Sequence, residues 1–151
     1  VAAMARIAQG AEQEPMTTRS HHRVGMSFAR CDETIALATM YAANHFNGVK
    51  AIISLTESGN TPLIMSRIRS GIPIYCFTPH PVTQRRVAMF RGVYPVPFDP
   101  TAYAPADVSD QAIAHLKRNG VVETGDWVIL TKGDSYHSTG GTNTLKILTV
   151  E

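Results

Sequence analysis

The segment AIISLTESGNTPLIMSRIRSGIPIYCF, residues 51–77, decides the fold. It contains two apolar runs, Ala51–Leu55 and Ile72–Phe77, which are rich in β-branched residues and have the length of buried strands. Between them Thr61–Ser70 has helical character, with Pro62 at a position that favours a helix start. A strand, a helix and a second strand in this order are typical of a parallel sheet covered by helices.

The same alternation continues on both sides of this segment. Upstream, a helix is expected to begin at Asp32, a good N-cap residue, and to end at Asn47-Gly48. Its apolar stripe is expected to consist of Ile35, Ala38, Ala42 and Phe46. Downstream, the expected helices are Pro81–Arg91 and Val108–Arg118, and the expected strands are Val93–Phe98, Trp127–Thr131 and Thr144–Val150.

Two features indicate how the strands are arranged. Pro95 and Pro97 mark Val93–Phe98 as a short edge strand, because proline cannot donate to a strand ladder. The last two strands are joined only by the Gly/Ser-rich loop Gly133–Gly141, which is too short for a comfortable parallel crossover. We therefore predict a three-layer α/β/α fold with a five-stranded mixed sheet, mostly parallel, in which the last strand is antiparallel.

The composition is that of one ordinary cytoplasmic domain. The 151 residues are 44% hydrophobic and carry a formal net charge of +2, too little positive charge to indicate nucleic-acid binding. No apolar run approaches the length of a membrane span. Cys31 and Cys76 lie outside any metal-like spacing, and a reducing compartment is the simpler interpretation of both.

The loop Thr56–Pro62 lies between the first strand and a helix, at the edge of the sheet where αβ proteins bind ligands. It offers the hydroxyls of Thr56, Ser58 and Thr61, together with Gly59, which allows close approach of the backbone. Hydroxyls and N–H groups at a helix start favour an anion, most naturally phosphate. Ordinary helix capping explains the same residues, and the loop by itself leaves both interpretations open.

A second polar loop, Lys132–Thr144, is placed to fold over a ligand held by the first, with a plain hairpin connection as the alternative. No motif for nucleotide hydrolysis, nucleophilic catalysis or metal binding is present, so no catalytic residue and no metal ligand is predicted. The basic patch Arg85, Arg86 and Arg91 is interpreted as a solvated face, or as a contact with a neighbouring subunit or a phosphate. The isolated histidines, interpreted as structural or solvated, are His45, His80 and His115.

Taken together, these segments resemble pyruvate kinase of the bacterial second type. The resemblance follows the family's order over almost the whole chain, in MARIAQGAE (4–12), ETIALATMYAANHFNGVKAIISLTESGNTPLIMSRIRSGIPIYCFTPH (33–80), RRVAMFRGVYPV (85–96), GDWVILTKGD (125–134) and STGGTNTLKILTV (138–150). It implies that residues 1–15 are a remnant of the last helix of a catalytic barrel. Residues 16–30 are then a linker, and residues 31–151 are the C-terminal regulatory domain.

The resemblance also implies a function. The parent enzyme transfers phosphate from phosphoenolpyruvate to ADP, giving pyruvate and ATP in glycolysis, and uses magnesium and potassium in its barrel. No position in this sequence matches those catalytic residues, so this chain alone is expected to be inactive and to hold no cofactor. In the family, the C-terminal domain binds an allosteric regulator and helps to assemble a homotetramer.

The effector site is the part of the family that maps onto this sequence residue by residue. The loop that grips phosphate corresponds to Thr56, Ser58, Gly59, Asn60 and Thr61. The loop that closes beside it corresponds to Gly133, Asp134, Ser138, Thr139, Gly140 and Gly141. This agreement favours a phosphate site over capping alone.

One position departs from the family pattern. Members that respond to fructose 1,6-bisphosphate often carry lysine at the position of Glu57 and arginine near Val108. Because a carboxylate repels a phosphate, a sugar monophosphate or AMP is the expected regulator. The alternative is a stand-alone sugar-phosphate-binding protein of the same fold. A small free-standing enzyme is disfavoured because no catalytic constellation is present.

Overall fold

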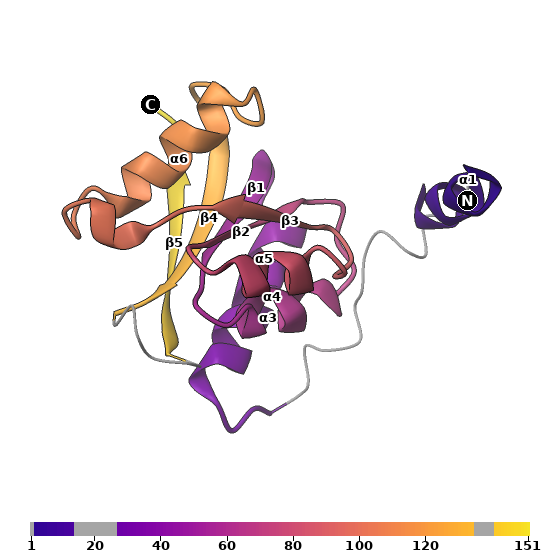
Figure 1. Cartoon of the computed structure of the whole chain (residues 1–151), viewed down its shortest axis with the longest axis horizontal. Helices are drawn as coiled ribbons and strands as arrows, with labels where there is room; N and C mark the ends of the chain where they lie inside the picture. The colour runs from indigo at the N-terminus through magenta and orange to yellow at the C-terminus, as the bar shows by residue number, and fades with distance from the viewer. Residues whose placement is uncertain (1, 14–26, 135–140) are drawn as a thin grey trace.

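The computed structural model describes residues 2–13, 27–134 and 141–151, and Figure 1 labels their helices and strands. The helices are α1 (Ala2–Gln13), α3 (Cys31–His45), α4 (Asn60–Ser66), α5 (Pro81–Val87) and α6 (Val108–Arg118), with a 3-10 turn at Pro100–Ala102. The strands are β1 (Val49–Leu55), β2 (Ile74–Thr78), β3 (Val93–Pro97), β4 (Trp127–Gly133) and β5 (Thr142–Thr149). Each helix and strand predicted from the sequence is present.

The five strands form one sheet in the order β3-β2-β1-β4-β5. β1 is parallel to both β2 and β4, β2 is parallel to β3, and β5 is antiparallel to β4. The predicted fold class is therefore confirmed, as are the antiparallel last strand and the edge position of the proline-containing strand. The four parallel strands place their carboxyl ends at one edge of the sheet.

Helices cover both faces of the sheet. Side chains along β1 and β4 alternate, so that Ile53 and Leu130 join the apolar cluster that contains α6 residues, whereas Ile52 and Ile129 join the cluster of α3, α4 and α5. All four side chains are fully buried, which explains why these strands are continuous apolar runs in the sequence. In Figure 1, α6 lies apart from α3, α4 and α5, which gather together.

The helix α3 departs from the prediction in two respects. Its N-cap is Arg30, and Asp32 lies inside the first turn, so the prediction of Asp32 as the N-cap is wrong. Phe46 is 41% exposed and lies edge-on against Trp127 instead of entering the core. Besides Asp32, the buried residues of α3 are Ala36, Thr39, Met40 and Ala43. In an alanine-rich helix, neighbouring stripes have similar hydropathy, so only packing against the sheet selects one of them.

The helices α4 and α5 are shorter than predicted. Beyond their last residues the backbone tightens, as shown by the bonds from Ile68 N–H to Met65 C=O and from Phe90 N–H to Val87 C=O, both 2.9 Å long. Such bonds between residues three apart satisfy carbonyl groups that the end of a helix leaves unpaired. The connections that follow are therefore longer than the sequence pattern suggests.

The side chains of residues 2–11 in α1 are all exposed, including Met4 and Ile7. Most of the predicted linker 16–30 lies outside the described residues. Within the described residues, no helix has both the length and the apolar character needed to cross a bilayer.

Candidate functional site

The two loops predicted to bind a ligand meet at the carboxyl edge of the sheet, around a small cavity of about 30 Å³. The predicted residues that line it are Thr56, Ser58, Asn60, Thr61, Gly133 and Gly141, and Leu55, Glu57 and Thr142 complete its wall. A volume of about 30 Å³ is the share of one water molecule in the liquid. A phosphate group would therefore sit in the mouth of this cavity, in contact with the groups that surround it.

Hydroxyl groups hold these loops in place. The Oγ1 atoms of Thr61 and Thr142 lie 2.7 Å apart, and both residues are buried, so this bond joins the first loop to the start of β5. The Oγ1 atom of Thr56 accepts a hydrogen bond from Gly59 N–H at 3.0 Å and fixes the turn between them. Ser58 is half-buried and lines the cavity, and its hydroxyl has no hydrogen-bond partner within the described residues. Ser58 is thus the hydroxyl most available to a ligand.

Gly59 shapes the first loop from behind the cavity. Its φ angle is 72°, in the left-handed region that favours glycine. A Cβ atom at this position would lie 2.6 Å from Cγ1 of Val87 and 3.2 Å from Cγ2 of Thr83, both on α5. The absence of a side chain therefore lets α5 pack directly against the loop.

Asn60 is engaged with α3. Its amide donates a hydrogen bond to Oδ2 of Asp32 at 2.8 Å. The same carboxylate accepts two bonds from the Arg30 guanidinium, at 2.7 and 2.9 Å. Burial by itself would raise the pKa of Asp32, but the bonds from Arg30 and Asn60 outweigh it and hold the pKa below its usual value. Asp32 is therefore a carboxylate that anchors the first loop.

Glu57 and His80 form a pair at the rim of the cavity. Oε2 of Glu57 contacts Nε2 of His80, and the hydroxyl of Thr83 donates to the backbone carbonyl of Glu57 at 2.9 Å. The interpretation of His80 as isolated is therefore wrong. Glu57 follows β1 and His80 follows β2, and the carboxyl ends of neighbouring parallel strands lie side by side.

The second loop is closed at its base by two glycines. A Cβ atom on Gly133 would lie 2.6 Å from the carbonyl oxygen of Gly141, so the two backbone segments approach closely. Asp134 is exposed, and its carboxylate accepts a hydrogen bond from the side-chain amide of Asn143 at 2.7 Å. The remaining predicted residues of this loop, Ser138, Thr139 and Gly140, lie outside the described residues.

Sequence reasoning missed three residues that support the site: Asp32, His80 and Thr142. Two of them carry a usable signal, because His80 follows a parallel strand and Thr142 lies within the GGTNT motif. Asp32 has the composition of an ordinary helix cap, and nothing in the sequence distinguishes that role from the anchoring bond to Asn60.

Comparison with known proteins identifies the family. Residues 33–148 match the family model described as pyruvate kinase, alpha/beta domain. The chain is 47% identical over all of its 151 residues to pyruvate kinase II of Salmonella typhimurium, and 40% identical over 151 residues to the pyruvate kinase of Haemophilus influenzae. It is 41% identical over 150 residues, 99% of the chain, to the pyruvate kinase of Buchnera aphidicola subsp. Schizaphis graminum.

The chain spans 31% of the length of each of these three relatives. The match to the alpha/beta domain agrees with the three-layer fold, and the identities extend over the loops of the cavity. The chain therefore belongs to the pyruvate kinase family, of which it represents the C-terminal alpha/beta domain.

Proposed function

We propose that this chain is the allosteric and oligomerisation domain of a pyruvate kinase, and that it binds a phosphorylated regulator at the cavity between its two polar loops. The observation that carries the proposal is the meeting of Thr56–Thr61 and Gly133–Gly141, which are far apart in the sequence, around one cavity. The half-buried Ser58 hydroxyl supports it, because it supplies a donor that no described residue uses. Neutral donors are well suited to grip one phosphate group.

The preferred regulator in this proposal is a sugar monophosphate or AMP. Glu57 lines the cavity and stays at its rim through its contacts with His80 and Thr83. A second phosphate that approached this rim would meet a carboxylate and lose affinity through like-charge repulsion. One phosphate in the mouth of the cavity avoids that repulsion.

The same proposal assigns the rest of the chain. Residues 1–15 belong to the catalytic barrel, 16–30 form the linker, and 31–151 form the regulatory domain of a cytoplasmic enzyme. The parent enzyme transfers phosphate from phosphoenolpyruvate to ADP, and this chain alone does not. The described residues contain no group of three or more His, Cys, Asp or Glu side chains placed to hold a metal ion, so magnesium and potassium belong to another part of the parent.

Assembly into a homo-oligomer, a tetramer in the parent, is supported by the edge strand β5. Its Ile147 is 40% exposed, and an unpaired edge with apolar side chains invites pairing with a second copy. Val150 does not contribute to such an edge, because it is buried. We expect Ile147→Lys to weaken concentration-dependent self-association in analytical ultracentrifugation. The matched control is Tyr94→Lys on the opposite edge strand β3, where Tyr94 is also exposed, and equal effects of both variants would contradict this role of β5.

The alternative function is a stand-alone sugar-phosphate-binding protein of the same fold. It predicts the same ligand at the same cavity, but no catalytic barrel in the same polypeptide. A reading frame that encodes the barrel and continues into Val1 separates the two possibilities.

Calorimetry tests the binding proposal. The ligands are ribose 5-phosphate, glucose 6-phosphate, AMP and fructose 1,6-bisphosphate, each titrated into the wild type, Ser58→Ala and Glu57→Lys. We expect Ser58→Ala to weaken a monophosphate by about five- to tenfold through the loss of one charge-assisted bond, without lowering the melting temperature. Glu57→Lys is expected to shift the preference towards the bisphosphate.

The control variant is Ser66→Ala, which removes a hydroxyl of similar exposure whose hydrogen bond goes to the Leu63 carbonyl, away from this cavity. Its affinities should equal those of the wild type. The proposal fails if no monophosphate binds, or if Ser58→Ala and Ser66→Ala behave alike. An unchanged preference in Glu57→Lys would remove the argument for a monophosphate and leave the site itself standing.

A further inference from the structure

A second cavity lies at the amino edge of the sheet, opposite the candidate effector site. It has a volume of about 200 Å³ and lies among α3, the end of α4, and the connections that lead into β2 and β3. It exists because α4 ends at Ser66 whereas β2 begins only at Ile74, so that the intervening connection forms a wall in place of a helix.

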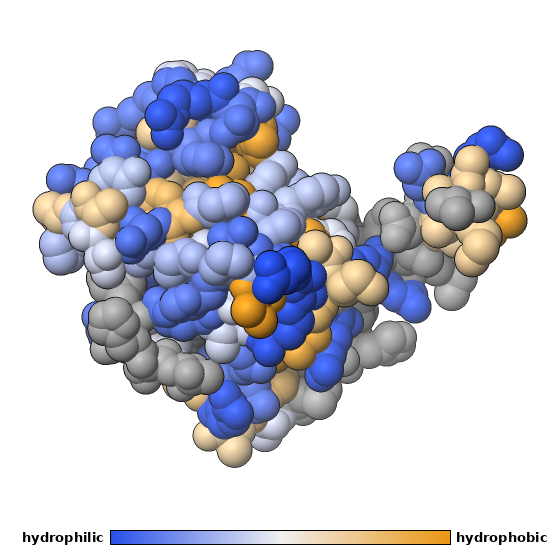
Figure 2. All heavy atoms as spheres, viewed as in Figure 1, coloured by the Kyte–Doolittle hydropathy of each residue, from blue (hydrophilic) through white to orange (hydrophobic). Residues whose placement is uncertain are grey.

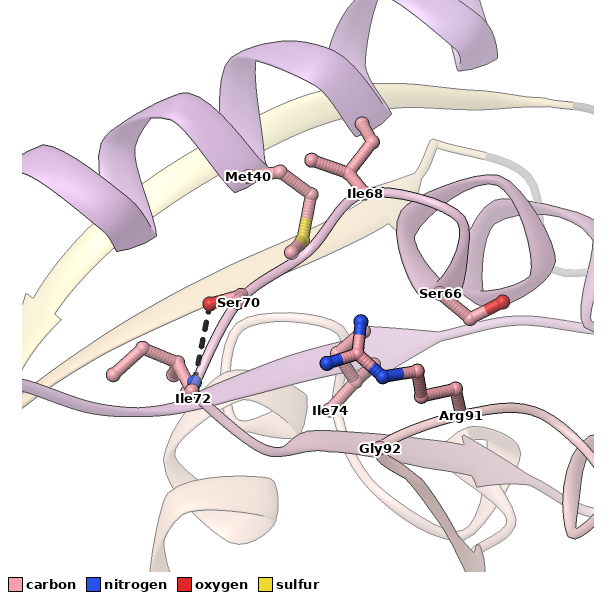
Figure 3. A pocket seen from close by; sticks show the side chains of 9 residues that line it. Met40, Ser66, Ile68, Ser70, Ile72, Ile74, Arg91 and Gly92 are labelled. Carbon is pink, nitrogen blue, oxygen red and sulfur yellow. Dashed lines mark hydrogen bonds between the residues drawn. The ribbon is translucent and has the colours of Figure 1, made fainter. Parts of the chain in front are cut away.

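The floor of this cavity is apolar, and a guanidinium group lies over it. Met40, Ile68 and Ile74 line the cavity and are buried. In Figure 3, the side chains of Met40 and Ile68 point into the cavity from one side, and Arg91 reaches in from the other side so that its guanidinium group lies near Ile74. The cavity therefore combines an apolar interior with one fixed positive charge.

A hydroxyl adds a second polar group to the rim. Oγ of Ser70 accepts a hydrogen bond from the Ile72 N–H at 3.1 Å, as Figure 3 shows. Because that bond uses a lone pair of the oxygen, the hydroxyl hydrogen of Ser70 can still be donated to a ligand. Arg91 and Ser70 thus offer donors, and no carboxylate lines the cavity.

The charge around the cavity points in the same direction. Residues 58–98 contain neither Asp nor Glu, and their five arginines are Arg67, Arg69, Arg85, Arg86 and Arg91. Figure 2 shows strongly hydrophilic residues over α5, whose last turn carries Arg85 and Arg86. Such a surface raises the local concentration of anions.

We propose that this cavity binds a small monocarboxylate with a compact apolar body. A dry cavity of about 150 Å³ accommodates benzene, so about 200 Å³ has room for a ring or a branched chain together with a carboxylate. The planar guanidinium matches a carboxylate with two parallel hydrogen bonds, while the apolar body packs on Met40 and Ile68. A sugar phosphate is disfavoured here, because its hydroxyl groups would face apolar side chains without partners.

Benzoate and benzamide are the probes that test the proposal, because they have the same shape and differ in charge. Each is titrated into the wild-type chain carrying ¹³C-labelled Met and Ile methyl groups, and the methyl signals are followed by NMR. We expect the signals of Met40, Ile68, Ile72 and Ile74 to move, with Ile53 in the opposite core cluster as the unmoved reference. Benzoate should bind at least about fivefold more tightly than benzamide, since only benzoate forms charge-assisted bonds.

Two arginine variants separate a local contact from a general effect of charge. Arg91→Gln should reduce the preference for benzoate to below about twofold, whereas Arg85→Gln, which removes an equal charge from exposed α5, should preserve it. Arg91→Lys should retain part of the preference, because it keeps the charge and loses the planar fork. Inorganic phosphate added at saturation should leave benzoate binding unchanged, since the candidate effector site is at the other edge.

Four results would overturn the proposal. These are an absence of benzoate binding, movement of methyl signals outside the cavity only, equal affinities for the two probes in the wild type, and equal losses in Arg91→Gln and Arg85→Gln. None of them bears on the phosphate site, which is tested by its own variants.

Discussion

The two edges of the parallel sheet are built in opposite ways. At the carboxyl edge, loops from distant parts of the chain are joined by hydrogen bonds such as Thr61–Thr142 and Asn60–Asp32, and the cavity between them is about 30 Å³. At the amino edge, a cavity of about 200 Å³ is left between apolar side chains, and Arg91 lies over it.

The difference shows how each kind of site is held in shape. A polar loop needs a specific partner for each buried donor and acceptor, because an unpaired one is costly. An apolar cavity needs only rigid walls, which the buried face of α3 and the start of β2 provide. We therefore expect the carboxyl edge to be sensitive to single atoms and the amino edge to tolerate small changes.

Gly59→Ala should give the largest effect and is the sharpest way to break this comparison. Gly59 at the carboxyl edge and Gly92 at the amino edge both have positive φ angles, 72° and 67°. A Cβ on Gly59 would overlap Val87, whereas a Cβ on Gly92 would have no heavy atom within 4 Å. The backbone penalty alone is about 1–2 kcal/mol, and overpacking adds about 1–3 kcal/mol.

The measurement is urea unfolding of both variants, followed by far-UV circular dichroism. Gly59→Ala should lose about 2–4 kcal/mol of unfolding free energy and Gly92→Ala only about 1–2 kcal/mol. Equal losses would show that the carboxyl edge is not the more tightly built of the two.

Thr61→Val should give the next largest effect. The change keeps the shape of the side chain but leaves the buried hydroxyl of Thr142 without its partner, at a cost of about 1–3 kcal/mol. Ser70→Ala, which removes the half-buried hydroxyl bonded to Ile72 N–H at the amino edge, should cost less than about 1 kcal/mol.

A double variant with Thr61→Val and Thr142→Val sharpens the point. Since both members of the bond are then replaced by apolar groups of the same shape, it should recover most of the stability lost in the single variant. Calorimetric melting of the set provides the measurement. A loss in the double variant equal to the sum of the two single losses would mean that the hydroxyls do not interact.

Asp32→Asn should give the smallest effect, about 1 kcal/mol at neutral pH, because the partner Arg30 is more than half exposed. The folded-state pKa of Asp32 is lowered, so the ionised form stabilises the fold above the unfolded-state pKa of about 3.9. That contribution is lost as the pH falls from this value through the folded-state pKa. The stability gap between wild type and variant should therefore be constant from about pH 5 to 8 and should narrow below about pH 4.

Chemical denaturation at a series of pH values checks this expectation. The variant Asp110→Asn serves as the matched control, because Asp110 lies in the first turn of α6 and is exposed. A gap for Asp32→Asn that widens in acid would reverse the sign of the argument.

The local pattern predicted the order and type of the elements, but not their ends. Ile52 and Ile53 on β1 belong to a run that is apolar on both faces, and such a run is recognisable without tertiary context. The ends of α4 and α5 depend on where their connections must reach the next strand, and both helices stop short of the residues that the pattern favours. The stripe of α3 was shifted because alanine carries little contrast in hydropathy.

For the candidate site, the sequence by itself determined which loops lie at the carboxyl edge, because strand, loop and helix follow one another in a fixed order along the chain. It also determined that Gly59, Thr61 and the glycines of the second loop belong there. Only the tertiary structure decided that Thr61 bonds Thr142, that His80 holds Glu57, and that Arg91 lies over an apolar cavity. The physical reason is that these contacts join residues from different loops and helices, and they form only when the whole sheet brings the two segments within hydrogen-bonding or packing distance.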